Sequence, residues 1–150
     1  MPLMPFHMGV GALFKAIGRD RFSFTVFAIS QVLIDIEPTT RSLSGDSLVH
    51  GPSHSVIGAL VVGSVAGAIG KPSGERILGR LKIEHAPITW PASFFSAFVG
   101  TYSHILLDVS KHRDMSPLWP FVEGNPLLGT VSVLTLHIIC VAAAALGIVM

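Results

Sequence analysis

The chain is poor in charge and in cysteine, and each shortage excludes a class of protein. Only 13% of its residues are charged, and the formal net charge is +1. The lysines and arginines are scattered, so the clustered basic surface that nucleic-acid binding needs is missing. A single cysteine, Cys140, leaves no intrachain disulfide and no cysteine-based zinc motif. We therefore expect neither a nucleic-acid partner nor a disulfide framework.

Apolar residues, in contrast, make up 50% of the 150 positions, and the mean hydropathy is +0.65. They gather in runs that are separated by short polar segments. The runs that we expect to form helices cover residues 6–17, 22–36, 55–70, 87–107 and 127–150. The last run is the longest and reaches the roughly 20 residues that cross a bilayer. Within the third run, Gly63 and Gly67 are spaced so that another helix can approach closely.

This pattern predicts one all-α domain over residues 1–150, a small transmembrane bundle of four to five short helices. Residues 39–54 are polar and read as a loop, because Pro38 should end the helix before them. Residues 71–85 are the most charged part of the chain and connect two apolar runs. Some runs are only about 15 residues long, which also suits the buried helices of a soluble domain. So many apolar segments, however, would leave too little polar surface to cover such a domain.

The charges also predict an orientation in the membrane. If every apolar run crosses, six basic residues share one side, namely Arg19, Arg21, Lys71, Arg76, Arg80 and Lys82. Only Arg41, Lys111 and Arg113 lie on the other side. An excess of Lys and Arg marks the cytoplasmic side. The same threading gathers most of the histidines and several carboxylates at the opposite, non-cytoplasmic face, where we predict a polar His/Asp site.

The pair His104 and Asp108 is the strongest candidate for metal binding. The two residues are four apart and so lie one helical turn from each other, where they can grip one cation from a rigid backbone. Asp108 also interrupts an apolar run, where an uncompensated carboxylate is costly. The alternative is that Asp108 only marks the exit of the helix into water. His112 and Asp114 follow as proton-transfer groups, as supporting residues of the site, or as solvated loop residues.

A second candidate is the turn His50-Gly51-Pro52-Ser53-His54. Its two histidines flank Gly-Pro directly before a predicted helix, so the turn can present both imidazoles to one metal ion. Ser53 or Ser55 would cap that helix. A pair of exposed loop histidines is the alternative.

Two carboxylates, Asp35 and Glu37, close the second apolar run. They offer hard oxygen ligands for a divalent cation, or they mark the membrane boundary. His7, at the start of the first run, is threaded to the same face and joins the candidate ligands. The segment 117–121, with two prolines and two aromatic residues, could form a rigid lip over the site or a plain interfacial loop.

In their order and spacing these motifs resemble the YdjM-like family of membrane-bound metal-dependent hydrolases. The likeness covers most of the chain and rests on His7, Asp35 with Glu37, His50 with His54, Ser103-His104-x-x-x-Asp108 and Pro117-Leu118-Trp119-Pro120. The family's Asp-x-Asp-His-Pro element appears here as Asp35-Ile36-Glu37-Pro38, without the histidine. The resemblance implies a small, multi-pass helical protein of the inner membrane with a metal-dependent hydrolytic site.

The leading hypothesis is a hydrolase of a phosphoester or ester at the membrane surface, acting through a metal-activated water. One or two divalent cations, zinc or manganese, suit mixed histidine and aspartate ligands. The predicted ligands are His7, Asp35, His50, His54, His104 and Asp108, and the predicted catalytic residues are Glu37, His112 and Asp114. The lipid bilayer is the expected partner, and a lipid is one possible substrate. The alternative is a non-enzymatic membrane protein with a structural metal site or a path for metal ions or protons.

Overall fold

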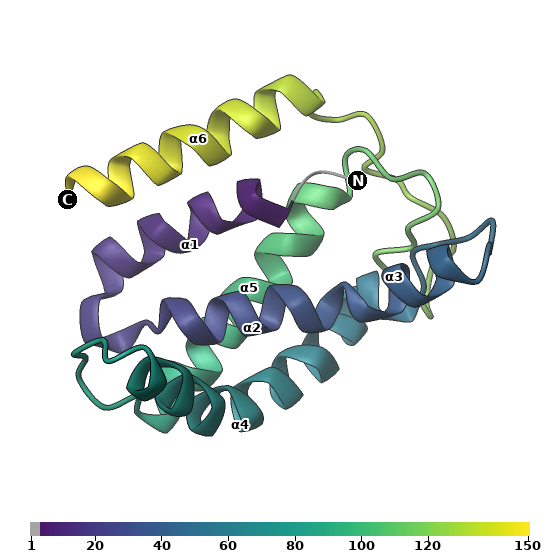
Figure 1. Cartoon of the computed structure of the whole chain (residues 1–150). Coiled ribbons are helices and arrows are strands. Elements are labelled where there is room, and N and C mark those ends of the chain that lie inside the picture. Colours follow the sequence, from purple (N-terminus) through teal and green to yellow (C-terminus); the bar gives the residue numbers. More distant parts are fainter. Residues whose placement is uncertain (1–3) are drawn as a thin grey trace.

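The computed structural model describes residues 4–150, and every regular element in this part of the chain is helical (Figure 1). The α-helices are α1 (Met4–Gly18), α2 (Phe24–Ile34), α3 (Ile36–Leu43), α4 (Val56–Arg80), α5 (Trp90–Asp108) and α6 (Val133–Val149). Two short 3₁₀ helices, η1 (Arg19–Arg21) and η2 (Pro52–His54), lie between them. The prediction of an all-α protein is confirmed.

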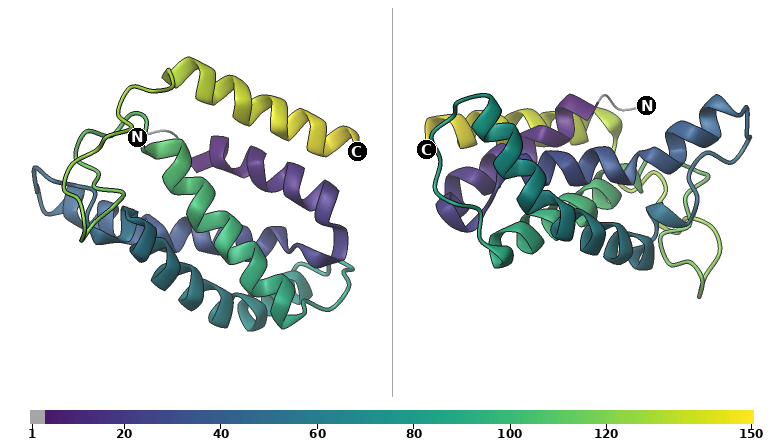
Figure 2. Two further views of the ribbon diagram at one scale, coloured as in Figure 1. Left: turned by 180° about the vertical axis from the view of Figure 1, so that it is seen from behind. Right: turned by 60° about the horizontal axis from the view of Figure 1, so that its bottom comes forward.

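Helices α2, α4 and α5 form the centre of the bundle, and each packs against the other two. Helix α1 contacts α2 and α5 and carries α6 on its outer side. Figures 1 and 2 show that α6 lies at the opposite side of the molecule from α4. The long loop between α5 and α6 folds back to the end of the bundle where α3 lies. Segments far apart in the sequence therefore meet at that end.

Small and hydroxyl residues allow the central helices to pack closely. A Cβ on Gly63 would lie 2.6 Å from a ring carbon of Phe98, and one on Gly67 would overlap Phe94. This confirms that the two glycines let a neighbouring helix, here α5, approach. The buried Ser93 hydroxyl donates to the Gly67 carbonyl at 2.7 Å. Such a bond between helices satisfies polar groups that neither water nor lipid can reach.

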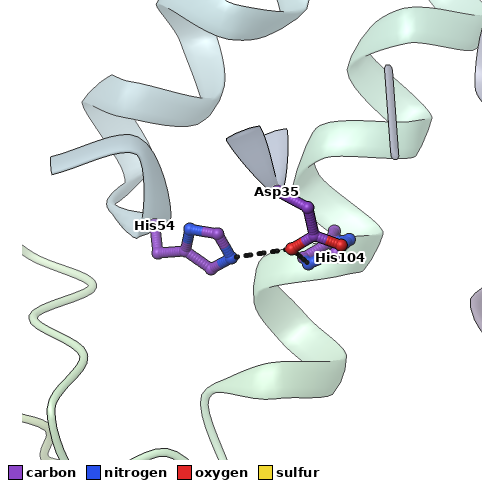
Figure 3. Close-up of side chains that lie close together, drawn as sticks. All are labelled: Asp35, His54 and His104. Atoms are coloured by element: carbon purple, nitrogen blue, oxygen red, sulfur yellow. Dashed lines mark ion pairs between the residues drawn. The ribbon is translucent and has the colours of Figure 1, made fainter. Parts of the chain in front are cut away.

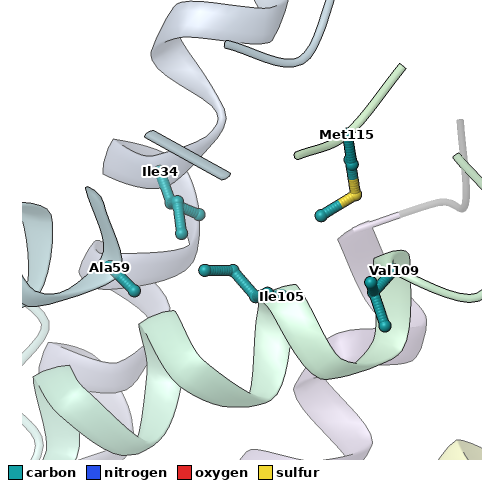
Figure 4. Close-up of a cluster of buried hydrophobic side chains, with 5 residues drawn as sticks. All are labelled: Ile34, Ala59, Ile105, Val109 and Met115. Carbon is teal, nitrogen blue, oxygen red and sulfur yellow. The ribbon is translucent and has the colours of Figure 1, made fainter. Parts of the chain in front are cut away.

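A buried apolar cluster fixes the end of the bundle where the polar residues gather (Figure 4). It consists of Ile34, Ala59, Ile105, Val109 and Met115, which are each at most 5% exposed. These side chains tie the end of α2, the start of α4 and the end of α5 to the loop that follows α5. Because Ile34, Ile105 and Val109 directly adjoin Asp35, His104 and Asp108 in the chain, the cluster also fixes the backbone of those three polar residues.

Two predicted helix boundaries are wrong. Residues 39–54 are not all loop, since α3 continues to Leu43 and the break before it falls at Asp35. Pro38 is tolerated because it lies in the first turn of α3, where a missing N–H costs no helical hydrogen bond. The charged segment after Gly70 is not a connector, because α4 runs through Pro72 to Arg80.

The last apolar run also differs from the prediction. Its first residues form turns, with Gly129 at a φ of 75° and Ser132 capping the helix by accepting the Thr135 N–H. Helix α6 is therefore 17 residues long rather than the longest span. Between residues 4 and 150, only the 25-residue α4 is long and apolar enough to cross a membrane.

Candidate metal centre

Four helical elements and one loop bring the predicted ligands together at one end of the bundle. Asp35 stands at the break between α2 and α3, and His54 ends η2 directly before α4. His104 and Asp108 lie in the last turns of α5, and His7 lies in the first turns of α1. Ser55, rather than Ser53, caps α4 by accepting the Gly58 N–H. The cap starts α4 there and holds His54 against the bundle.

The first group of side chains consists of Asp35, His54 and His104, which point toward one another from three elements (Figure 3). Asp35 Oδ1 lies 3.2 Å from His104 Nε2 and 3.8 Å from His54 Nε2. Each residue offers one ligand atom, and these atoms all lie within 4.8 Å of one another. Both imidazoles are buried, while the Asp35 side chain keeps 26% of its surface exposed.

The second group consists of His50, Asp108 and His112, and its ligand atoms meet the same spacing. It adjoins the first group, since Asp108 Oδ2 lies 3.2 Å from His104 Nε2. The ring centroids of His50 and His54 are 4.9 Å apart, and those of His50 and His112 are 4.1 Å apart. The two groups thus form one continuous centre, which we call the His/Asp centre.

Three of the imidazoles are held from behind through Nδ1. His104 Nδ1 lies 2.7 Å from Gln31 Oε1, and the Gln31 amide nitrogen donates to the Gly100 carbonyl, which fixes the orientation of the amide. His50 Nδ1 lies 3.0 Å from both carboxylate oxygens of Asp114. An acceptor behind Nδ1 assigns the proton to that nitrogen and leaves the Nε2 lone pair facing the centre. His54 Nδ1 contacts the Ser53 hydroxyl at 3.0 Å.

The atoms that face the centre, in contrast, make no hydrogen bond within residues 4–150. They are His54 Nε2, His104 Nε2 and His112 Nε2, all buried. Buried polar atoms are nearly always satisfied, and each unsatisfied one costs about 1–3 kcal/mol. A divalent cation bound to imidazole nitrogens and carboxylate oxygens would satisfy these atoms. The residues present therefore fit a metal ion.

Two histidines outside the long helices, His54 and His112, are electrostatically suited to metal binding, because a metal ion binds the neutral ring. Burial lowers the pKa of His54 to about 3, helped by the neighbouring His104 and His50. Burial and His50 lower the pKa of His112 to about 4. Both rings are thus neutral at neutral pH. Burial acts to raise the pKa of Asp114, but hydrogen bonds from the His50 and Val49 N–H groups lower it to about 2.

His7 lies beside the two groups and is not part of either. Its Nε2 is 3.5 Å from Asp108 Oδ1, and its ring packs against that of His104, with centroids 4.5 Å apart and planes tilted by 35°. Lys111 Nζ lies 3.3 Å from the same Asp108 oxygen, and its side chain is only 13% exposed. Asp108 therefore has a fixed cation on one oxygen and faces His104 with the other.

Two of the predicted catalytic residues have both carboxylate oxygens engaged by neighbouring protein groups. Glu37 Oε2 accepts the Ser53 N–H at 2.8 Å, and Glu37 Oε1 pairs with Arg41. Both carboxylate oxygens of Asp114 lie 3.0 Å from His50 Nδ1, as described above. His112 alone among the three places an unpartnered nitrogen in the centre.

The sequence interpretation missed two residues of this site. Gln31 lies in an apolar run, four residues before Asp35, and an uncharged amide in a helix gives no signal of a role behind a ligand. Lys111 follows Asp108 by three residues, a spacing that puts both on one helical face. That spacing could have identified the ion pair.

Comparison with known proteins identifies one family. A family model described as YdjM inner membrane protein matches residues 7–149, which is nearly the whole chain. No curated protein and no solved structure matches the chain.

Proposed function

The chain belongs to the YdjM inner membrane protein family, and on this premise we propose that it is a membrane-bound hydrolase that uses two divalent cations. Its substrate would be a phosphoester or ester at the membrane surface. Membership in the family implies association with a lipid bilayer. The two groups of the His/Asp centre would each hold one cation, with zinc or manganese the best match to mixed nitrogen and oxygen ligands.

The observation that carries this proposal is the contrast between the two sides of the imidazoles. Behind His104 and His50, each Nδ1 meets an oxygen acceptor, whereas the buried Nε2 atoms of His54, His104 and His112 meet no hydrogen-bond partner. This is the arrangement that metal-binding histidines need, because the outer partner fixes the ring and its tautomer.

In this proposal the residues of the centre have separate roles in the reaction. When bound, the cations supply an activated water and polarise the ester oxygen. Asp35 Oδ1 faces the two imidazoles of its group, and its partly exposed carboxylate leaves Oδ2 free to accept the proton of the attacking water. As the ester bond breaks, the Asp35 carboxyl would return this proton to the leaving oxygen. His112 would act as a ligand, and Asp114 would orient His50.

A structural metal site or an ion path is the rival function. A catalytic metal keeps an open position, whereas a structural one is enclosed by protein ligands. Two clefts reach the centre here, one lined by His50 and Asp114 and the other also by His112. Access from outside to these ligands favours catalysis.

Metal content tests the proposal directly. We expect about two equivalents of zinc or manganese in protein purified in detergent without chelators, measured by mass spectrometry of the elements. His104→Ala and Asp108→Ala should lose metal, while His85→Ala should keep it, because His85 pairs with Glu75 and lies outside the His/Asp centre.

Activity is then measured on the same samples with a panel of phosphoesters and esters. Hydrolysis should be lost with the metal in His104→Ala and persist in His85→Ala. Wild-type protein without metal would overturn the proposal. Protein with its metal in place but inert on the whole panel would favour the structural site.

A further inference from the structure

One of the two clefts beside the His/Asp centre contains two arginines that the proposed chemistry has not used. It is a cleft of about 460 Å³, a size typical of sites for small ligands. Arg41 of α3 and Arg113 of the loop after α5 line it together with His50, Gly51 and Trp119. Arg113 also lines the neighbouring cleft, which reaches His112. Both arginines therefore stand where a molecule would approach the centre.

Arg41 is held in place by a short series of contacts that starts at the turn of residues 50–54, which we call the ligand turn. The Ser53 N–H donates to Glu37 Oε2 at 2.8 Å. Glu37 Oε1 accepts from Arg41 Nε at 3.1 Å and forms an ion pair with Arg41 Nη2 at 3.0 Å. One edge of the guanidinium is thus fixed. Its outer edge, formed by Nη1 and the second Nη2 hydrogen, keeps a two-donor fork for an external acceptor.

Gly51 makes room for this arrangement. A Cβ at position 51 would lie 2.9 Å from Arg41 Nη2 and would overlap Glu37 Oε1. The turn that carries His50 and His54 therefore approaches the ion pair more closely than any residue with a side chain would allow. The position of Arg41 relative to the ligand turn is consequently fixed by packing.

Arg113 supplies the second positive charge. It is exposed, and within residues 4–150 it makes no ion pair. Its neighbour Asp114 lines the same two clefts, but its carboxylate is engaged by His50 Nδ1 at 3.0 Å. Glu123 also lines the cleft and opposes an anion. The cleft is thus electrostatically favourable to an anion only when cations occupy the adjacent centre, so the inference rests on the proposed function.

From this juxtaposition we infer that Arg41 and Arg113 bind the phosphate group of the substrate beside the His/Asp centre, and that the substrate is a phosphoester rather than a carboxylic ester. Donors from two directions suit the tetrahedral oxygens of a phosphate, and the Arg41 fork can bind two of them at once. Glu37 is a positioning residue in this arrangement.

Calorimetric titration with inorganic phosphate tests the inference on full-length, metal-loaded protein in dodecyl maltoside. Arg41→Gln and Arg113→Gln should each raise the Kd of phosphate about tenfold or more, because each removes a charge-assisted hydrogen bond. Glu123→Gln should lower the Kd, since it removes a repulsive charge. Arg80→Gln is the matched control, because this arginine is exposed at the end of α4 and lines neither cleft.

Added lipid identifies the source of the phosphate. If phosphatidylglycerol in the micelles weakens phosphate binding while diacylglycerol does not, the site takes a lipid headgroup. If neither lipid has an effect, it takes a soluble phosphate compound.

Metal analysis of each sample separates the two proposals. Wild-type protein that lacks metal contradicts the proposed function. If the metal is present but phosphate does not bind, or binds equally to wild type, Arg41→Gln and Arg113→Gln, the inference is wrong. Arg113→Lys, which keeps the charge and loses the fork, should give an intermediate Kd.

Discussion

Each imidazole in the centre that is fixed from behind has a different partner. His104 uses the neutral amide of Gln31, His50 the carboxylate of Asp114, and His54 the hydroxyl of Ser53. A carboxylate makes an imidazole a stronger ligand than an amide does. Gln31, in contrast, adds no charge at a site that is completely buried. His104 is therefore oriented without the desolvation cost of another buried carboxylate.

Gln31→Met tests this role at the level of one residue. Methionine has a similar shape but cannot accept the His104 N–H, so the ring loses its fixed tautomer. We expect metal affinity to fall about 10–100-fold, as for other residues that orient metal ligands. Competition with a chromophoric chelator measures it.

Ser103→Ala is the control, because the Ser103 hydroxyl donates to the same Gly100 carbonyl as Gln31 but does not contact His104. Equal affinities for Gln31→Met and wild type would show that the amide does not orient the ligand.

The types of the site residues were readable from the sequence, but their pairing was not. His104 and Asp108 were predicted to bind one cation together; they lie 3.2 Å apart, as residues four apart in a helix can, but they fall in different groups of candidate ligands. His50 and Asp114 are separated by 64 positions, and no local pattern shows that the carboxylate would bind the imidazole from behind. Glu37 was predicted as a catalytic residue. The break between α2 and α3 instead turns its carboxylate toward Ser53 and Arg41.

At the level of the helices, α4 and α5 place two ligand-bearing segments at the same end of the bundle. The chain enters α4 just after His54 and leaves α5 at Asp108, so the two histidines His54 and His104 meet only if the helices stay in register. Gly63 and Gly67 set the separation of the helices against Phe98 and Phe94. The close approach of another helix was predictable here from the spacing of the two glycines, although the identity of that helix was not. The length of α4 was not, since its charged second half and Pro72 resemble a loop.

Gly67→Val should push α5 away from α4, because its side chain would overlap Phe94. Overpacking of this kind typically costs about 1–3 kcal/mol in the free energy of unfolding. We expect a lower midpoint of thermal unfolding in detergent and weaker metal binding, since both ligand segments shift.

Gly79→Ala on the same helix is the control. No atom lies within 4 Å of the added Cβ, and alanine is the better helix former, so stability should be unchanged or slightly higher. A Gly67→Val variant as stable as wild type would show that the close approach of α4 and α5 is not needed.

On the scale of the whole molecule, the His/Asp centre lies at the start of α4, the helix that is suited to cross a membrane. Of the helices between residues 4 and 150, it alone has the length and hydropathy of a membrane span. Several of its apolar side chains are exposed, among them Leu60, Val61, Val65 and Ile69. Lipid would cover such a surface. If α4 crosses, the His/Asp centre at its start and the basic segment at its end lie on opposite faces of the membrane.

Cysteine labelling tests this orientation. In a Cys140→Ala background, Asp46→Cys reports the side of the centre and Glu84→Cys the side of the basic segment. Both positions are exposed, and acidic residues contribute little to topology, so neither change should alter the orientation. Because Lys71, Arg76, Arg80 and Lys82 favour the cytoplasm, a membrane-impermeant maleimide should label position 46 in cells whose inner membrane is intact. Position 84 should react only after the membrane is opened. The reverse pattern would place the centre in the cytoplasm, and labelling of both positions in intact cells would show that α4 does not cross.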